Sequence, residues 1–139
     1  MTEGIDAAKV GSWLAAQVPA LTPPLSYELM AGGHSNLTYR ASDAAGRHYV
    51  LRRPPLGHVL ESAHDMGREY RIVHALAGST VPVAPSHGLC LDLDVNGAPF
   101  FVMDFVHGLV PHDAQSAALI PAAERLALSI DVAEVLARL

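Results

Sequence analysis

Cysteine is almost absent from this 139-residue chain, and long apolar runs are absent altogether. Cys90 is the only cysteine, which excludes a disulfide framework and favours a reducing compartment such as the cytoplasm. The first ten residues, MTEGIDAAKV, lack the basic and then apolar order of a secretory signal peptide. No apolar run approaches the roughly 20 residues that span a bilayer. We therefore expect no membrane partner.

Positive charge is also scarce, and it comes almost entirely from arginine. The chain has nine lysines and arginines against 14 aspartates and glutamates, a formal net charge of −5, which argues against a nucleic-acid partner. Lys9 is the only lysine. Any mechanism that relies on a lysine beyond the N-terminal segment must do without it.

The composition that is present is apolar for a small domain. A chain of 139 residues fits one domain, which at this size needs no metal or disulfide to be stable. Half of the residues are hydrophobic, and the mean hydropathy is +0.25. This surplus predicts apolar surface that meets a partner or a further part of the same protein.

Hydrophobic periodicity predicts three helices. Apolar residues at helical spacing indicate an amphipathic helix over residues 6–18. A second helix begins at a capping signal formed by Ser62 and Asp65 and runs to Ala77. A third runs from about Pro121 to the end of the chain.

Short alternating segments between these helices predict strands. The dipeptide Asn96-Gly97 is the strongest short hairpin signal known, so we expect a two-residue turn there. The DAAG stretch at 43–46 predicts another turn. The chain is thus expected to be α+β, with a five-stranded antiparallel sheet and a helix packed against it. The expected strands are 25–31, 37–43, 48–53, 88–94 and 98–106.

Five strands with one helix between the third and fourth resemble the N-lobe of a protein kinase. The stretches GGHSNLTYRAS, YVLRRPP, ESAHDMGREYRIVHAL, VPVAPSHGLC and GAPFFVMDFVHGLVP, in this order, resemble the aminoglycoside phosphotransferase family. They resemble most its branch related to the kinase-like domain attached to some acyl-CoA dehydrogenases. The resemblance covers residues 25–139. It implies an N-terminal helix and linker over 1–24, a kinase-like N-lobe with hinge over 25–110, and the start of a helical C-lobe over 111–139.

The resemblance also implies that catalysis needs a larger C-lobe. There an aspartate acts as base and a later aspartate holds magnesium. The last helix ends with its apolar stripe still running, so we expect the rest of the C-lobe to lie outside this chain. The stretch HDA at 112–114 lacks the context of a catalytic loop and is interpreted as a polar loop. We expect no catalytic residue in this chain, and at most weak ATP binding by it alone.

The glycine-containing loop has two interpretations. The resemblance implies that Gly32, Gly33, Ser35 and Asn36 form a lid over the phosphates of ATP, because backbone N–H groups can converge there without interference from Cβ atoms. Taken alone, these residues favour a hairpin loop that binds nothing.

The third strand carries the expected phosphate-binding cation. Alternation places Val50 and Arg52 on one face and Leu51 and Arg53 on the other. The resemblance implies that Val50 contacts adenine and that Arg52 stands where kinases place a lysine. Arginine binds phosphate but does not replace lysine equally. The alternative is a solvated arginine pair at the end of a strand.

Glu69 is the expected partner of that cation. The resemblance implies that it orients Arg52 from the helix after the third strand, through a bidentate pair. The alternative pairs Glu69 with Arg68 or Arg71 on its own helix.

The segment FFVMDFVHG is expected to be the last strand and the hinge. The resemblance implies that Met103 is the gatekeeper, and that the carbonyl of Asp104 and the N–H of Val106 face the edge of adenine. A buried strand at the edge of the core would look the same, and both interpretations can hold together.

Two patterns suggest metal sites and are rejected. DLDVNG at 92–97 matches the start of a calcium loop, but Met103 stands where a glutamate is required. The eight histidines form no HxxxH or HExxH pattern. We expect no metal ligands in this chain, and magnesium is expected to bind to the C-lobe.

The sequence therefore favours the nucleotide-binding N-lobe of an ATP-dependent phosphotransferase that acts on the hydroxyl of a small molecule. The alternative is a non-catalytic kinase-like module that pairs through its apolar surface, with the missing C-lobe or with itself. The acceptor cannot be read from these residues.

Overall fold

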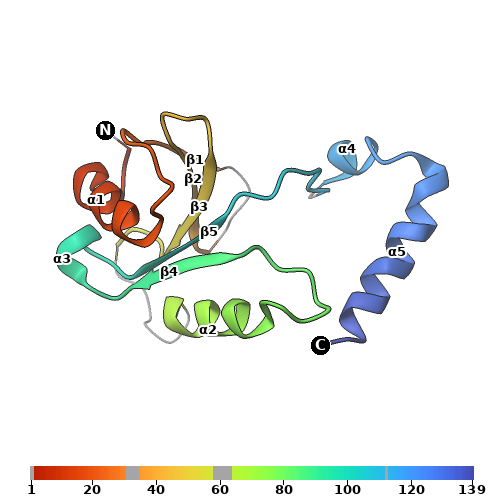
Figure 1. The fold of residues 1–139 in the computed structure, drawn as a ribbon. Helices are drawn as coiled ribbons and strands as arrows, with labels where there is room; N and C mark the ends of the chain where they lie inside the picture. Colours follow the sequence, from red (N-terminus) through yellow and green to blue (C-terminus); the bar gives the residue numbers. More distant parts are fainter. Residues whose placement is uncertain (1, 31–34, 58–63, 112) are drawn as a thin grey trace.

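The computed structural model describes residues 2–30, 35–57, 64–111 and 113–139. A single antiparallel sheet has the strand order β1-β2-β3-β5-β4 (Figure 1). This α+β arrangement confirms the predicted five-stranded sheet. The strands are β1 (Ser26–Leu29), β2 (Leu37–Ser42), β3 (His48–Arg53), β4 (Ser86–Cys90) and β5 (Phe100–Asp104). The helices are α1 (Ala7–Gln17), α2 (Met66–Leu76), α3 (Leu93–Asn96), α4 (Ala114–Ala117) and α5 (Ala122–Leu136).

The turn between β2 and β3 sets the register of the sheet. The Asp43 carboxylate accepts hydrogen bonds from the backbone N–H groups of Ala45 and Arg47, at 2.9 and 2.8 Å. Gly46 adopts a φ of 81°, which favours glycine. Ser42 therefore pairs with His48, and the predicted turn is confirmed. Every residue further along the two strands is paired as a consequence.

One face of the sheet is closed by α1. Tyr39, Leu51 and Val102 point to this face and are almost fully buried, and Leu14 of α1 packs into the same core. The ring of Trp13 meets the ring of Phe100 edge to face at 4.9 Å. Residues 1–24 thus contribute directly to the core that stabilises the sheet.

Gly88 on β4 allows α1 to approach this closely. A Cβ atom at Gly88 would lie 3.1 Å from the Trp13 ring and 3.3 Å from the side-chain oxygen of Gln17. The lack of a side chain at this position therefore sets how near the helix can lie to the strand.

Arg53 fastens the N-terminal segment to this face. Its guanidinium donates to the carbonyl of Gly4, and Nε donates to the carbonyl of Pro54 at 3.1 Å. Tyr39 donates its hydroxyl to the carbonyl of Glu3 at 2.8 Å. Burial lowers the pKa of Arg53. The alternative of a solvated arginine pair at 52–53 is therefore wrong.

The predicted hairpin turn at Asn96-Gly97 is also wrong. A two-residue turn there would pair Val95 with Ala98, whereas the structure pairs Cys90 with Phe100 and leaves residues 91–99 as the connection. Local and tertiary bonds favour the helical turn α3 instead. Asp92 accepts from the N–H of Asp94, Gly97 ends the turn at a φ of 67°, and the Asn96 side chain accepts from the N–H of Asp6.

Helix α2 begins one turn later than the predicted capping box. Asp65 is the N-cap, and its carboxylate accepts from the N–H of Arg68 at 2.9 Å. Ser62 lies outside the described residues. The polar loop expected at 112–114 is partly wrong, because Asp113 caps the short helix α4 that starts at Ala114; His112 lies outside the described residues.

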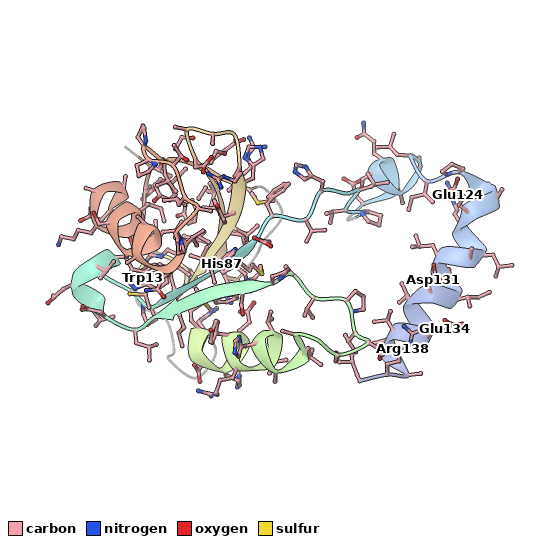
Figure 2. All side chains as sticks on the ribbon, viewed as in Figure 1. Trp13, His87, Glu124, Asp131, Glu134 and Arg138 are labelled. Carbon is pink, nitrogen blue, oxygen red and sulfur yellow. The ribbon has the colours of Figure 1, made fainter. Side chains whose placement is uncertain are left out.

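Helix α5 forms where it was expected but has no buried residue. Its side chains project into solvent along its length (Figure 2). Arg138 donates to the carbonyl of Thr80 at 3.4 Å, near the end of α2. Across the described parts of the chain, no helix is both long and apolar enough to cross a membrane.

Candidate functional site

The second face of the sheet carries the predicted site residues. Val50 of β3 and Met103 of β5 are register partners, and the next row places Arg52 between Thr38 and Phe101. Helix α2 covers part of this face, where Tyr70 contacts Phe101 edge to face at 6.1 Å. Toward the hinge and under α2, this face of the sheet is therefore apolar. Beside the apolar part lies a polar row formed by Thr38 and Arg52.

Arg52 and Glu69 form the predicted pair across β3 and α2. Nε of Arg52 lies 2.7 Å from Oε1 of Glu69, with 29% of the Arg52 side chain and 32% of the Glu69 side chain exposed. The Nε–H does not point along this line, so the contact is an ion pair rather than an aligned hydrogen bond. The predicted bidentate geometry is not formed. The single contact leaves the outer part of the guanidinium less constrained.

The other carboxylate oxygen of Glu69 is held by a residue that was expected at the phosphates. Asn36 donates from Nδ2 to Oε2 of Glu69 at 3.1 Å. Oδ1 of Asn36 lies 2.8 Å from Nδ1 of His64. The Asn36 side chain therefore joins the end of the glycine-containing loop to α2.

Two polar residues of this site, Thr38 and His64, were not predicted. Thr38 accepts from Nη1 of Arg52 at 3.4 Å. The turn at 43–46 could have revealed it, because pairing Ser42 with His48 places Thr38 opposite Arg52. His64 carried no such signal, since it precedes the helix by two residues and follows no periodic segment.

The rest of the predicted lid is only partly described. Ser35 is exposed. Gly32 and Gly33 lie outside the described residues, so their role stays a prediction.

Among the described residues, the N–H groups of Val106, His107 and Gly108 in the hinge segment have no acceptor. The N–H of Asp104 donates to the carbonyl of Pro85 at 2.8 Å, and that of Phe105 donates to the carbonyl of His48 at 3.4 Å. Within the described ranges no acceptor receives the N–H of Val106, whose side chain is 68% exposed. The Asp104 carboxylate turns to His87, with Oδ1 2.6 Å from Nε2. The hinge thus offers a backbone donor at its exposed end.

A further groove lies close to the start of α2. It has a volume of about 920 Å³ and lies between the start of α2 and the β4–β5 connection. Its lining includes Pro54, Met66, Leu91, Leu93 and Pro99 but neither Arg52 nor the hinge. Among the described residues, no group of three or more His, Cys, Asp or Glu side chains could hold a metal ion.

Known proteins resemble this chain in sequence and in fold. A family model described as phosphotransferase enzyme family matches residues 26–139. A crystal structure of a Ralstonia eutropha JMP134 protein, described as an aminoglycoside phosphotransferase, has a TM-score of 0.74 and 34% sequence identity. The match covers 96% of this chain and 37% of that protein. It confirms the expected kinase-like fold.

Curated relatives confirm the expected branch. The chain is 37% identical over 118 residues to acyl-CoA dehydrogenase family member 10 of Mus musculus, and 38% identical over 115 residues to acyl-CoA dehydrogenase family member 11 of Gallus gallus. These matches cover 85% and 83% of this chain. The chain spans only 11% and 14% of the lengths of the two relatives.

Proposed function

The chain belongs to the phosphotransferase enzyme family, and from this premise we propose that it is the nucleotide-binding N-lobe of an ATP-dependent phosphotransferase. In this proposal the phosphoryl acceptor is a hydroxyl group on a small molecule. The observation that carries the proposal is the ion pair between Arg52 and Glu69, on the same sheet face as Val50 and Met103.

The residues on this face suit a nucleotide. An arginine held at one side by a carboxylate keeps its charge and presents the rest of its planar fork to phosphate oxygens. Val50 is 8% exposed and, with Met103, provides an apolar surface of the kind that a purine base covers. The N–H of Val106 has no acceptor among the described residues, so it can donate to the edge of the base.

Catalysis in this proposal depends on positioning and electrostatics. Arg52 and the loop that ends at Asn36 would hold the phosphates, and the hinge would hold the base. The catalytic base and the magnesium ligands would come from a helical C-lobe. No metal-ligand cluster is present among the described residues, so no step is assigned to magnesium here.

The exposed apolar side chains of α5 support the proposal that a second lobe packs against this helix. Leu126, Val132 and Leu136 are more than half exposed, although such side chains are normally buried. A helix with this surface is explained if it packs against further helices of a catalytic unit.

A titration followed by NMR tests the proposal. We expect millimolar ATP to shift the amide signals of Val50, Arg52 and Val106 in the 139-residue chain. Arg52→Ala should weaken this binding by about tenfold, since it removes a charge-assisted contact. Arg40→Ala is the matched control, because Arg40 lies on the same face but pairs with Glu28 on β1.

Two results would contradict the nucleotide site. One is a set of ATP-dependent shifts at other residues of the chain but not at Val50, Arg52 or Val106. The other is an equal loss of affinity in both arginine variants, which would indicate an effect of net charge alone.

A second candidate function is a non-catalytic interaction module. The observation that favours it is again α5, which has no buried residue. Light scattering after gel filtration separates the two candidates. A concentration-dependent dimer that ATP does not perturb favours the module, and a monomer with ATP-dependent shifts favours the phosphotransferase.

A further inference from the structure

The two oxygens of Glu69 are engaged by different residues. Oε1 lies against Nε of Arg52, whereas Oε2 accepts from Nδ2 of Asn36. A carboxylate has no hydrogen to donate, so Asn36 must turn its NH₂ group toward Glu69. This contact fixes the orientation of the Asn36 amide.

The amide orientation in turn fixes the tautomer of His64. With NH₂ on Glu69, Asn36 presents Oδ1 to Nδ1 of His64 at 2.8 Å. An amide oxygen only accepts, so Nδ1 of His64 must carry the hydrogen. His64 therefore acts as the donor that holds Asn36 in place.

This arrangement controls how Arg52 can meet Glu69. A free arginine–carboxylate pair favours two parallel hydrogen bonds, which with Nε at Oε1 would draw an Nη group onto Oε2 of Glu69. Asn36 takes one acceptor position of Oε2 and holds the carboxylate in an orientation in which Arg52 contacts only Oε1. Nη1 makes only a long 3.4 Å bond to Thr38, and within the described ranges Nη2 has no partner. The terminal nitrogens therefore remain available to an anion.

We propose that Asn36 is a positioning residue that limits Arg52 to one oxygen of Glu69 and keeps its outer nitrogens free for the phosphates of a nucleotide. His64 supports this by holding the Asn36 amide through Nδ1–H. The inference rests on the proposed function, in which Arg52 binds phosphate. It also assigns Asn36 a side-chain role on Glu69 rather than on the phosphates.

The first test is spectroscopic and needs no ligand. Long-range ¹⁵N–¹H spectra of the full chain should show His64 as the Nδ1–H tautomer. In Asn36→Leu, which matches asparagine in size but cannot hydrogen bond, His64 should lose this tautomer. His74 is an internal control, because Ser86 Oγ, 3.0 Å from its Nδ1, can donate or accept. Its spectrum should not change.

The second test is nucleotide binding. Asn36→Leu should weaken ATP binding by about fivefold to tenfold, the effect of losing roughly one hydrogen-bonded constraint, and should leave adenosine binding within about twofold. In a Glu69→Gln background, Asn36→Leu should cause no further loss, since the carboxylate that could clamp Arg52 is gone.

The outcomes separate this inference from the proposed function. If Arg52→Ala leaves ATP affinity unchanged, the proposed function fails. If Arg52→Ala weakens ATP binding but Asn36→Leu does not, only the positioning role fails. An Nε2–H tautomer of His64 in the unaltered chain, or an additive loss in the double variant, also overturns the positioning role.

Discussion

The two faces of the sheet differ in how far they are buried and in whether they carry polar side chains, although they are built from alternate residues of the same strands. On the α1 face, Tyr39, Leu51 and Val102 are at most 1% exposed. On the opposite face, Thr38 and Arg52 remain partly exposed, and α2 covers only part of the surface. The first face is buried in the core under α1, whereas the second face combines buried Val50 and Phe101 with polar groups that a ligand can reach.

This difference suggests that stability and function are separated by one residue step along β3. Leu51 lies in the core, while Arg52 contacts Glu69, and Arg53 returns to the core side. Substitutions on the α1 face should therefore affect mainly the free energy of unfolding. Substitutions on the opposite face should affect mainly nucleotide binding.

The largest expected effect on stability is at Leu14 of α1, which packs against the buried face of the sheet. Leu14→Ala should lower the free energy of unfolding by about 2 to 5 kcal/mol, because a fully buried leucine leaves a cavity. Leu136→Ala on α5 is the matched control; with 63% of that side chain exposed, its effect should stay within about 0.5 kcal/mol. Urea unfolding followed by circular dichroism measures both. Equal losses would mean that α5 is as firmly packed as α1.

A smaller effect is expected where α1 approaches β4. Gly88→Ala should cost about 1 to 3 kcal/mol, because the new methyl group would crowd Trp13 and Gln17. Gly108→Ala has no neighbouring atom within 4 Å of the added Cβ and serves as the control. Unfolding by urea and the fluorescence of Trp13 report the change. An unaltered Trp13 spectrum with unaltered stability would show that the close approach is not required.

The turn at Asp43, which fixes the register of β2 and β3, should make the free energy of unfolding depend on pH. Burial alone would raise the pKa of Asp43, but backbone N–H donors from Arg47, Thr22 and Ala45, together with the Arg47 guanidinium, lower it below its ordinary value of 3.8. The stability that the ionised carboxylate contributes is present above pH 3.8 and is lost as the pH falls through the lowered pKa.

Asp43→Asn should accordingly be less stable than the unaltered chain at neutral pH, by less than the loss for Leu14→Ala. The difference should stay constant from about pH 7 to about pH 4 and should shrink as the pH falls further. Urea titrations at several pH values measure it. A difference that stays constant below about pH 4 as well would show that the charge of Asp43 does not stabilise the turn.

The smallest effect on stability is expected on the opposite face of the sheet, which α2 covers only in part. Glu69→Gln should change the free energy of unfolding by less than about 1 kcal/mol, because the pair with Arg52 is about one third exposed. It should nevertheless alter the Nε–H signal of Arg52 in NMR spectra. A loss comparable to that of Leu14→Ala would mean that the polar row also stabilises the fold, and the contrast between the faces would disappear.

Sequence reasoning succeeded where the deciding interactions are local. The DAAG turn and the alternation along β3 each depend on residues within a few positions, so they could be predicted. The turn at Asn96-Gly97 could not, because Asn96 is held by the N–H of Asp6, 90 residues away. The contacts of His64 with Asn36 and of Arg53 with Gly4 were missed for the same reason.

The sequence by itself determined the number of strands and the family. It also determined which residues of β3 share a face, since a period of two is a property of the extended backbone. The tertiary structure decided what each face meets. It placed α1 on one side and Glu69 and Asn36 on the other. As a result, Arg53 contacts the core side, whereas the adjacent Arg52 is a candidate phosphate ligand. Side chains far apart in sequence meet only after the chain has packed, and no local pattern encodes that meeting.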